Sequence, residues 1–201
     1  MFYTCIISII NGFDILEKLF FYDIMNNIKK EKIIKDGRCN DVNIKSNLRV
    51  LMAFNNIKNL REMGFKAGVS WKIIQRLDTN KDISKIRLGN LLKVARALNC
   101  RLSDLIRTEW DRKDYKQVLQ NSQSRSSTNI RILMALNGIR TLKDIMQLTG
   151  ISWSVLTKLD KGEALETIEL HNILKVCVLF GCDIEELINF NYDYEIKEFK
   201  F

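Results

Sequence analysis

The sequence contains the same segment twice. Residues 46–106 align without a gap with residues 128–188, at a constant offset of 82 positions, and 22 of the 61 aligned positions are identical. The clearest match is between GVSWKIIQRLD at 68–78 and GISWSVLTKLD at 150–160. A repeat of this length without insertions predicts two copies of one small domain that arose by duplication.

Each copy has the hydrophobic spacing of short helices. The helices predicted in the first copy begin near Ser46 or Asn47 and continue at 60–67, 71–79, 86–98 and around Leu105-Ile106. Those of the second copy begin near Thr128 or Asn129 and continue at 141–149, 153–161, 168–180 and around Leu187-Ile188. No segment shows sustained period-two alternation, and proline is absent. We therefore predict an all-α fold with about five short helices per copy.

A glycine turn precedes the third predicted helix of each copy. Gly68 and Gly150 can adopt the left-handed backbone that ends the preceding helix. Ser70 and Ser152 are predicted to cap the third helix by accepting from its free amide groups.

The third helix has one apolar face. In the first copy, Ile74 and Leu77 lie three positions apart and are predicted to face the core. This leaves an outward-facing set: Trp71, Lys72, Gln75 and Arg76. Asn80 and Gly162, which tolerate positive φ, are predicted to end the third helices.

The positive charge is concentrated in the first copy. The chain carries a net charge of +8, yet residues 46–107 hold 13 basic and 4 acidic groups while residues 128–188 hold 6 and 8. Such an asymmetry is typical of a surface that binds a polyanion. The alternative is a surface that only keeps the protein in solution.

These elements, in this order and at these spacings, resemble the Cro and lambda-repressor type (XRE-type) helix-turn-helix domain. The resemblance covers 46–107 and 128–189. It implies two lambda-repressor-like bundles in tandem. It also implies a sequence-specific, repressor-like regulator of transcription that binds double-stranded DNA in the cytoplasm, at the nucleoid, of a bacterium or its phage.

The resemblance also implies which residues contact DNA, because the third helix of this family enters the major groove. Base contacts are expected at Trp71, Lys72, Gln75, Arg76, Trp153, Ser154, Thr157 and Lys158. Phosphate contacts are expected at Ser70, Arg61, Lys81, Lys85, Ser152, Lys143 and Lys161.

Two positions depart from the family pattern. Leucine stands at positions 60 and 142, where a glutamine often opens the second helix and contacts the DNA backbone. Gly64 and Met146 occupy the place of a small residue at which the second and third helices pack.

Other side chains have two interpretations. Trp71 and Trp153 could contact thymine methyl groups or could pack against the second helix. Arg49 with Asp78, and Arg131 with Asp160, are candidates for an ion pair between the first and third helices.

The second copy has the weaker chemistry for binding DNA. Glu163, Glu166 and Glu169 stand where phosphates would lie, and they would repel DNA. We expect this copy to read a weaker half-site or to serve in pairing. Homodimer formation, through this copy or the N-terminal segment, is a further hypothesis.

The remaining segments surround the two domains. Residues 1–45 are interpreted as a helical extension, in which Ile15, Leu16, Leu19 and Phe20 recur at helical spacing. Met25 is an alternative start. Residues 108–127 form a linker that ends in a polar, flexible stretch, and residues 190–201 form a tail.

Several function classes find no support in the sequence. One histidine, His171, and five cysteines without a Cys-x-x-Cys spacing give no metal site and no disulfide framework. Cys100 and Cys182 are predicted to be core thiols. No apolar run can span a membrane, and neither a catalytic motif nor a cofactor motif is present. The rival hypothesis is a protein-interaction module, such as an antirepressor or antitoxin, built on the same fold.

Overall fold

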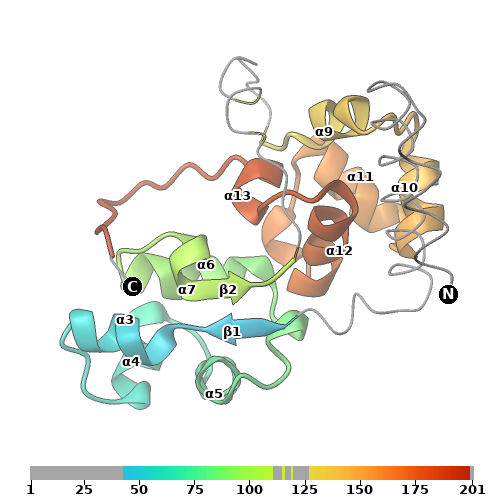
Figure 1. The fold of residues 1–201 in the computed structure, drawn as a ribbon. Helices are drawn as coiled ribbons and strands as arrows, with labels where there is room; N and C mark the ends of the chain where they lie inside the picture. Colours follow the sequence, from blue (N-terminus) through green and yellow to red (C-terminus); the bar gives the residue numbers. More distant parts are fainter. Residues whose placement is uncertain (1–42, 111–114, 116–118, 120–126, 200–201) are drawn as a thin grey trace, which may run out of the picture.

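The computed structural model describes residues 43–110, 115, 119 and 127–199. The first copy, blue to green in Figure 1, and the second, yellow to red, each form a small helical unit. The all-α prediction is confirmed, since ten α-helices lie in the described residues, five in each copy. The helical extension with Ile15 to Phe20 and the alternative start at Met25 lie outside these residues.

The helices repeat from one copy to the other. The first copy contains α3 (Leu48–Phe54), α4 (Leu60–Ala67), α5 (Trp71–Thr79), the 3-10 helix η2 (Ile83–Lys85), α6 (Leu88–Ala97) and α7 (Leu102–Leu105). The second contains α9 (Ile130–Leu136), α10 (Leu142–Thr149), α11 (Trp153–Lys161), η3 (Leu165–Thr167), α12 (Leu170–Phe180) and α13 (Ile184–Leu187).

The turns repeat as closely as the helices. Gly68 and Gly150 end α4 and α10 in the left-handed conformation, and Asn80 and Gly162 do the same for α5 and α11, as predicted. The capping prediction for the two serines is wrong in its chemistry. Ser70 and Ser152 hold the N-cap positions, but their side chains make no capping hydrogen bond. Their backbone carbonyls accept the first helical bonds instead.

The core of each copy lies beneath the third helix. Ile74 and Leu77 are fully buried, as are their counterparts Leu156 and Leu159. The thiols of Cys100 and Cys182 are also fully buried, which confirms them as core residues.

A two-stranded sheet closes the first copy and was not predicted. Strand β1 (Ile44–Ser46) pairs antiparallel with β2 (Ile106–Thr108), and Ser46 lies opposite Ile106. The counterparts of that last pair, Thr128 and Ile188, form a single antiparallel bridge. Strands of three residues are too short to produce a readable alternation, because period two needs at least four positions to differ from chance.

The two copies pack against each other across an approximate twofold axis. At the seam, Arg87 and Glu169, which are equivalent positions, form an antiparallel bridge. The Leu88 amide donates to the Ile168 carbonyl at 2.9 Å, and the Leu170 amide donates to the Ile86 carbonyl at 2.9 Å. Helix α6 packs on η3, and α12 packs on η2.

The segment that follows each copy crosses to the other copy. After the second copy, residues 190–199, which we call the C-terminal arm, run from α13 to the first copy (Figure 1). There the Tyr194 hydroxyl donates to the Cys100 carbonyl at 2.9 Å. After the first copy, the Trp110 indole donates to the Cys182 carbonyl at 3.3 Å. Because Cys100 and Cys182 are equivalent positions, the exchange is reciprocal.

The C-terminal arm corrects a statement about the sequence. Phe190, Tyr192, Tyr194 and Ile196 are half-buried and alternate with exposed residues. This is the period-two alternation that was said to be absent, and it marks an extended segment that packs on one side.

Candidate nucleic-acid interface

Helices α4 and α5 form a closely packed pair in the first copy. Gly64 on α4 is buried, and a Cβ built at this position would lie 3.5 Å from the Val69 carbonyl oxygen in the turn. This is an ordinary van der Waals distance, so the turn lies against α4 without requiring glycine there. In the second copy the half-buried Met146 fills the equivalent place, so the same packing accommodates a larger side chain.

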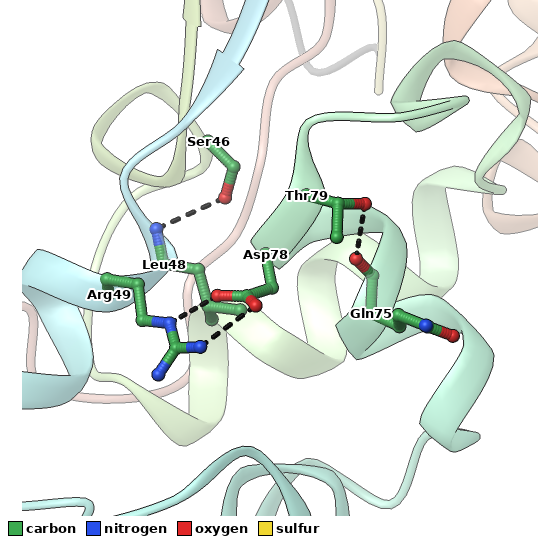
Figure 2. A network of polar contacts seen from close by, with 6 residues as sticks. All are labelled: Ser46, Leu48, Arg49, Gln75, Asp78 and Thr79. Atoms are coloured by element: carbon green, nitrogen blue, oxygen red, sulfur yellow. Dashed lines mark hydrogen bonds and ion pairs between the residues drawn. The ribbon is translucent and has the colours of Figure 1, made fainter.

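An ion pair ties the far end of α5 to α3. Figure 2 shows the Arg49 guanidinium against the Asp78 carboxylate, with Nε on Oδ1 and Nη2 on Oδ2 at 2.9 Å. The hydrogen bond and the charge of Asp78 raise the pKa of Arg49. Arg131 and Asp160 repeat the pair. The predicted ion pairs are thus confirmed in both copies.

The outward face of α5 carries three polar side chains that point away from the core. Lys72 and Gln75 are exposed and Arg76 is half-buried. Within the described residues, no hydrogen bond or ion pair engages their side-chain ends. Trp71 is 52 % exposed and Trp153 is 55 % exposed, so about half of each side chain is covered and the rest is open to solvent.

The family model for the Cro/C1-type helix-turn-helix DNA-binding domain matches residues 47–111 and, a second time, residues 129–193. The chain belongs to this family. No solved structure gives a significant match to it. The two helix-turn-helix units are therefore α4 with α5 and α10 with α11, and the chain is of the DNA-binding regulator kind.

The outward face of the second Cro/C1-type domain differs in its hydrogen bonds. The Lys158 ammonium donates to the Thr167 hydroxyl at 2.8 Å, and the Thr157 hydroxyl donates to the Trp153 carbonyl at 2.9 Å. The Ser154 hydroxyl lies 3.1 Å from that of Ser152. The polar groups expected to contact bases from α11 are thus engaged within the chain.

The cations expected to contact phosphates lie around both helix-turn-helix units. Exposed members of this set are Arg61, Lys81, Lys85, Lys143 and Lys161, together with the hydroxyl residues Ser70 and Ser152. Lys85 differs from the other cations because its ammonium pairs with Asp82 at 2.6 Å.

The positive charge of the first domain lowers the pKa of Asp82. Its pKa lies below the usual range, first because of the hydrogen bond and charge of Lys85, and further because of the charges of Arg76 and Lys72. In the second domain the equivalent loop carries Glu163 and Glu166, which are exposed. The loops that follow the third helices therefore carry net charges of opposite sign, positive in the first domain and negative in the second.

An aromatic residue beside the helix-turn-helix unit was missed by the sequence reasoning. Phe65 on α4 is 81 % exposed, and it lines a groove of about 830 Å³ together with Trp71 and Arg61. Its position off the apolar stripe of α4 is the signal that could have identified it. The second domain has Gln147 there, so the groove adds to the difference between the domains.

The described parts of the chain contain neither a candidate metal site nor a candidate membrane span. No group of three His, Cys, Asp or Glu side chains is placed there to hold a metal ion. None of the helices described is both long and apolar enough to cross a bilayer.

Proposed function

We propose that the protein is a sequence-specific, repressor-like regulator that reads double-stranded DNA chiefly with α5. The observation that carries the proposal is that the side-chain ends of Lys72, Gln75 and Arg76 on α5 have no hydrogen bond or ion pair with any residue that the structure describes. The ion pair between Arg49 and Asp78 supports it, because it fixes the helix that presents them. Pre-organised donors lose less entropy when they bind.

The chemistry of these side chains suits base edges in the major groove. Arg76 and Lys72 can donate to guanine O6 and N7, and Gln75 can form a two-point contact with adenine. Each well-placed contact contributes about 1–3 kcal/mol of discrimination against the wrong base. The exposed ring of Trp71 can contact a thymine methyl group.

Phosphate contacts would set the register of the complex. Arg61 and Lys81 are exposed cations near the start and the end of the helix-turn-helix unit, and Ser70 keeps its hydroxyl free of a capping bond. Lys85 would exchange Asp82 for a phosphate. In the second domain Ser152, Lys143 and Lys161 have the corresponding roles.

The seam allows one chain to act as a pair. Family members that dimerise place their recognition helices about 34 Å apart on successive major grooves. Here the backbone bonds of Leu88 and Leu170 join the two domains within one molecule, so a homodimer is not needed to present two helices. We assign the weaker half-site to α11, through Trp153, Ser154, Thr157 and Lys158. The resulting operator is asymmetric.

Selection of bound duplexes from random DNA tests this function with the full chain. We expect one conserved half-site and one degenerate half-site, and one chain per duplex by light scattering. Arg76→Ala should relax base preference at one position of the strong half-site. Lys158→Ala, at the equivalent position, serves as the matched control and should leave that half-site unchanged.

The rival hypothesis predicts a different outcome. A protein-interaction module, such as an antirepressor or antitoxin, would select no duplex, and its affinity for DNA would not fall steeply with salt. DNA binding through six or more phosphates loses roughly 10³-fold or more in affinity between 50 and 200 mM salt. A flat salt dependence together with no selected sequence would overturn the proposal in favour of the rival.

A further inference from the structure

A cavity of about 460 Å³ opens on the seam, and none of its lining residues belongs to α5 or α11. Its walls come from three parts of the chain: α6 with its N-cap residue Arg87, the η3 segment of the second domain and the C-terminal arm. Ligand sites of about 300–1,000 Å³ are commonly found where domains meet. This cavity has both the size and the place of such a site.

One wall of the cavity is cationic. Arg87 and Lys93 line it, are exposed, and have no hydrogen bond or ion pair of their side chains within the described residues. A third cation, Arg96, is already held by the carboxylate of Asp193 in the C-terminal arm. Glu166 is the other acidic residue of the lining. The lining therefore has one positive charge in excess.

The C-terminal arm gives the cavity an aromatic lining. Phe190, Tyr192 and Tyr194 line the cavity, and their neighbouring ring centroids lie 5.7 and 5.5 Å apart. The hydroxyls of the two tyrosines are engaged elsewhere. Tyr194 donates to the Cys100 carbonyl, and Tyr192 donates to Glu185 at 3.0 Å while it accepts from the Leu102 amide. The rings are thus held in place, and they contribute apolar surface to the cavity.

We propose that this cavity binds a small planar aromatic anion, of the aromatic carboxylate class. The ring of the ligand lies against the aromatic side chains of the C-terminal arm. Its carboxylate accepts hydrogen bonds from Lys93 and Arg87. Stacked aromatic pairs and charge-assisted hydrogen bonds are the two interactions that such a ligand can use, and the lining offers both.

The site is specific to one side of the twofold axis. The counterpart of Arg87 is Glu169, and the counterpart of Gly89 is His171, which pairs with Glu169 at 3.2 Å. The counterpart of Lys93 is Lys175, which is not part of the lining. An anion is therefore favoured on the side of α6. The ligand contacts both domains and the arm, so its binding would stabilise the seam.

Isothermal titration of the full chain with indole-3-carboxylate tests the proposal. Two probes serve as controls: indole-3-carboxamide, which keeps the ring and loses the charge, and cyclohexanecarboxylate, which keeps the charge and loses the planar ring. We expect the carboxylate to bind with one site per chain and each control to bind about tenfold more weakly. Equal binding of all three probes, or no binding of indole-3-carboxylate at millimolar concentration, would overturn the proposal.

A pair of matched variants locates the site. Lys93→Ala removes an exposed cation of the lining and should weaken indole-3-carboxylate about tenfold. Lys175→Ala removes the equivalent cation of the second domain and should leave the affinity unchanged. Thermal unfolding without ligand verifies that both variants fold. If both variants lose affinity equally, or neither does, the cavity on the seam is not the site.

Discussion

Arg49 on α3 and Asp78 on α5 are joined by a two-point ion pair, and Arg131 and Asp160 repeat it in the second domain. The carboxylate is the more enclosed partner, since the Asp78 side chain is 16 % exposed and that of Arg49 is 64 % exposed. The pair therefore links α3 to α5 and sets the angle of α5 relative to the rest of the domain.

Breaking the ion pair between Arg49 and Asp78 should lower both the stability of the protein and its affinity for DNA. Asp78→Ala should lower the melting temperature and weaken duplex binding, because α5 loses its attachment to α3. Arg49→Ala should do the same, and the double variant should lose less than the sum of the two single variants. Asp160→Ala is the control, which should lower the melting temperature while the strong half-site is still bound. Strictly additive effects would show that the ion pair has no energetic role.

A charge reversal in the second domain should strengthen DNA binding. Glu163 occupies the position equivalent to Lys81. Glu163→Lys removes a repulsive carboxylate and adds a phosphate contact, so the slope of log affinity against log salt should steepen by roughly one. Lys81→Ala should reduce the slope by a similar amount, for all sequences alike. An unchanged slope in Glu163→Lys would place the η3 loop away from the DNA.

The close contact of Gly89 with the second domain predicts that a larger residue there is destabilising. A Cβ built on Gly89 would lie 2.8 Å from the Glu166 Cβ and 3.1 Å from the Glu166 carbonyl oxygen, whereas one on Gly64 meets nothing closer than 3.5 Å. Alanine in a helix normally gains about 0.5–1 kcal/mol over glycine. We expect Gly64→Ala to show this gain in urea unfolding. Gly89→Ala should instead lose about 1 kcal/mol or more, because overpacking separates the domains. If both variants were more stable than the parent protein, the contact between Gly89 and Glu166 would have to adjust to a Cβ at little cost.

The buried thiols predict a pH-dependent behaviour. Burial, followed by the charges of Asp104 and Glu185, raises the pKa of Cys100 to about 12. In an unfolded chain a thiol has a pKa of about 8.5. The neutral thiol is thus favoured in the folded state, and its contribution to stability is present below pH 8.5 and falls as the pH rises from there toward 12. Cys100→Ala should reduce this alkaline loss in urea unfolding at pH 7.5 and 10.

Alkylation provides a second measurement on the same group. The thiolate is the reactive form, so iodoacetamide at pH 8 should leave the Cys100 peptide unmodified in the folded protein and label it in guanidinium chloride. Cys177, whose pKa burial also raises, should behave alike. Rapid labelling of either peptide in the native protein would contradict the buried, protonated state.

The helices and turns of each domain could be predicted because their signals are local. The spacing of Ile74 and Leu77 indicates a helix face, and Gly68 indicates the turn because glycine tolerates a positive φ. The Arg49 and Asp78 pair could be suggested from charge, but a separation of 29 positions does not determine a contact. The C-terminal arm had a readable alternation in Phe190, Tyr192 and Tyr194 that was overlooked.

By itself, the sequence determined that there are two domains of one family, that they are all-α, and that the first carries the positive charge. Only the tertiary structure decided that Lys158 donates to Thr167 while Arg76 has no side-chain partner among the described residues, and that a cavity forms where the arm crosses the seam. The physical reason is the distance along the sequence between the interacting residues. Helices follow from spacings of three or four residues, whereas the seam depends on backbone bonds such as Leu88 to Ile168, which join distant segments and leave no mark on side-chain identity.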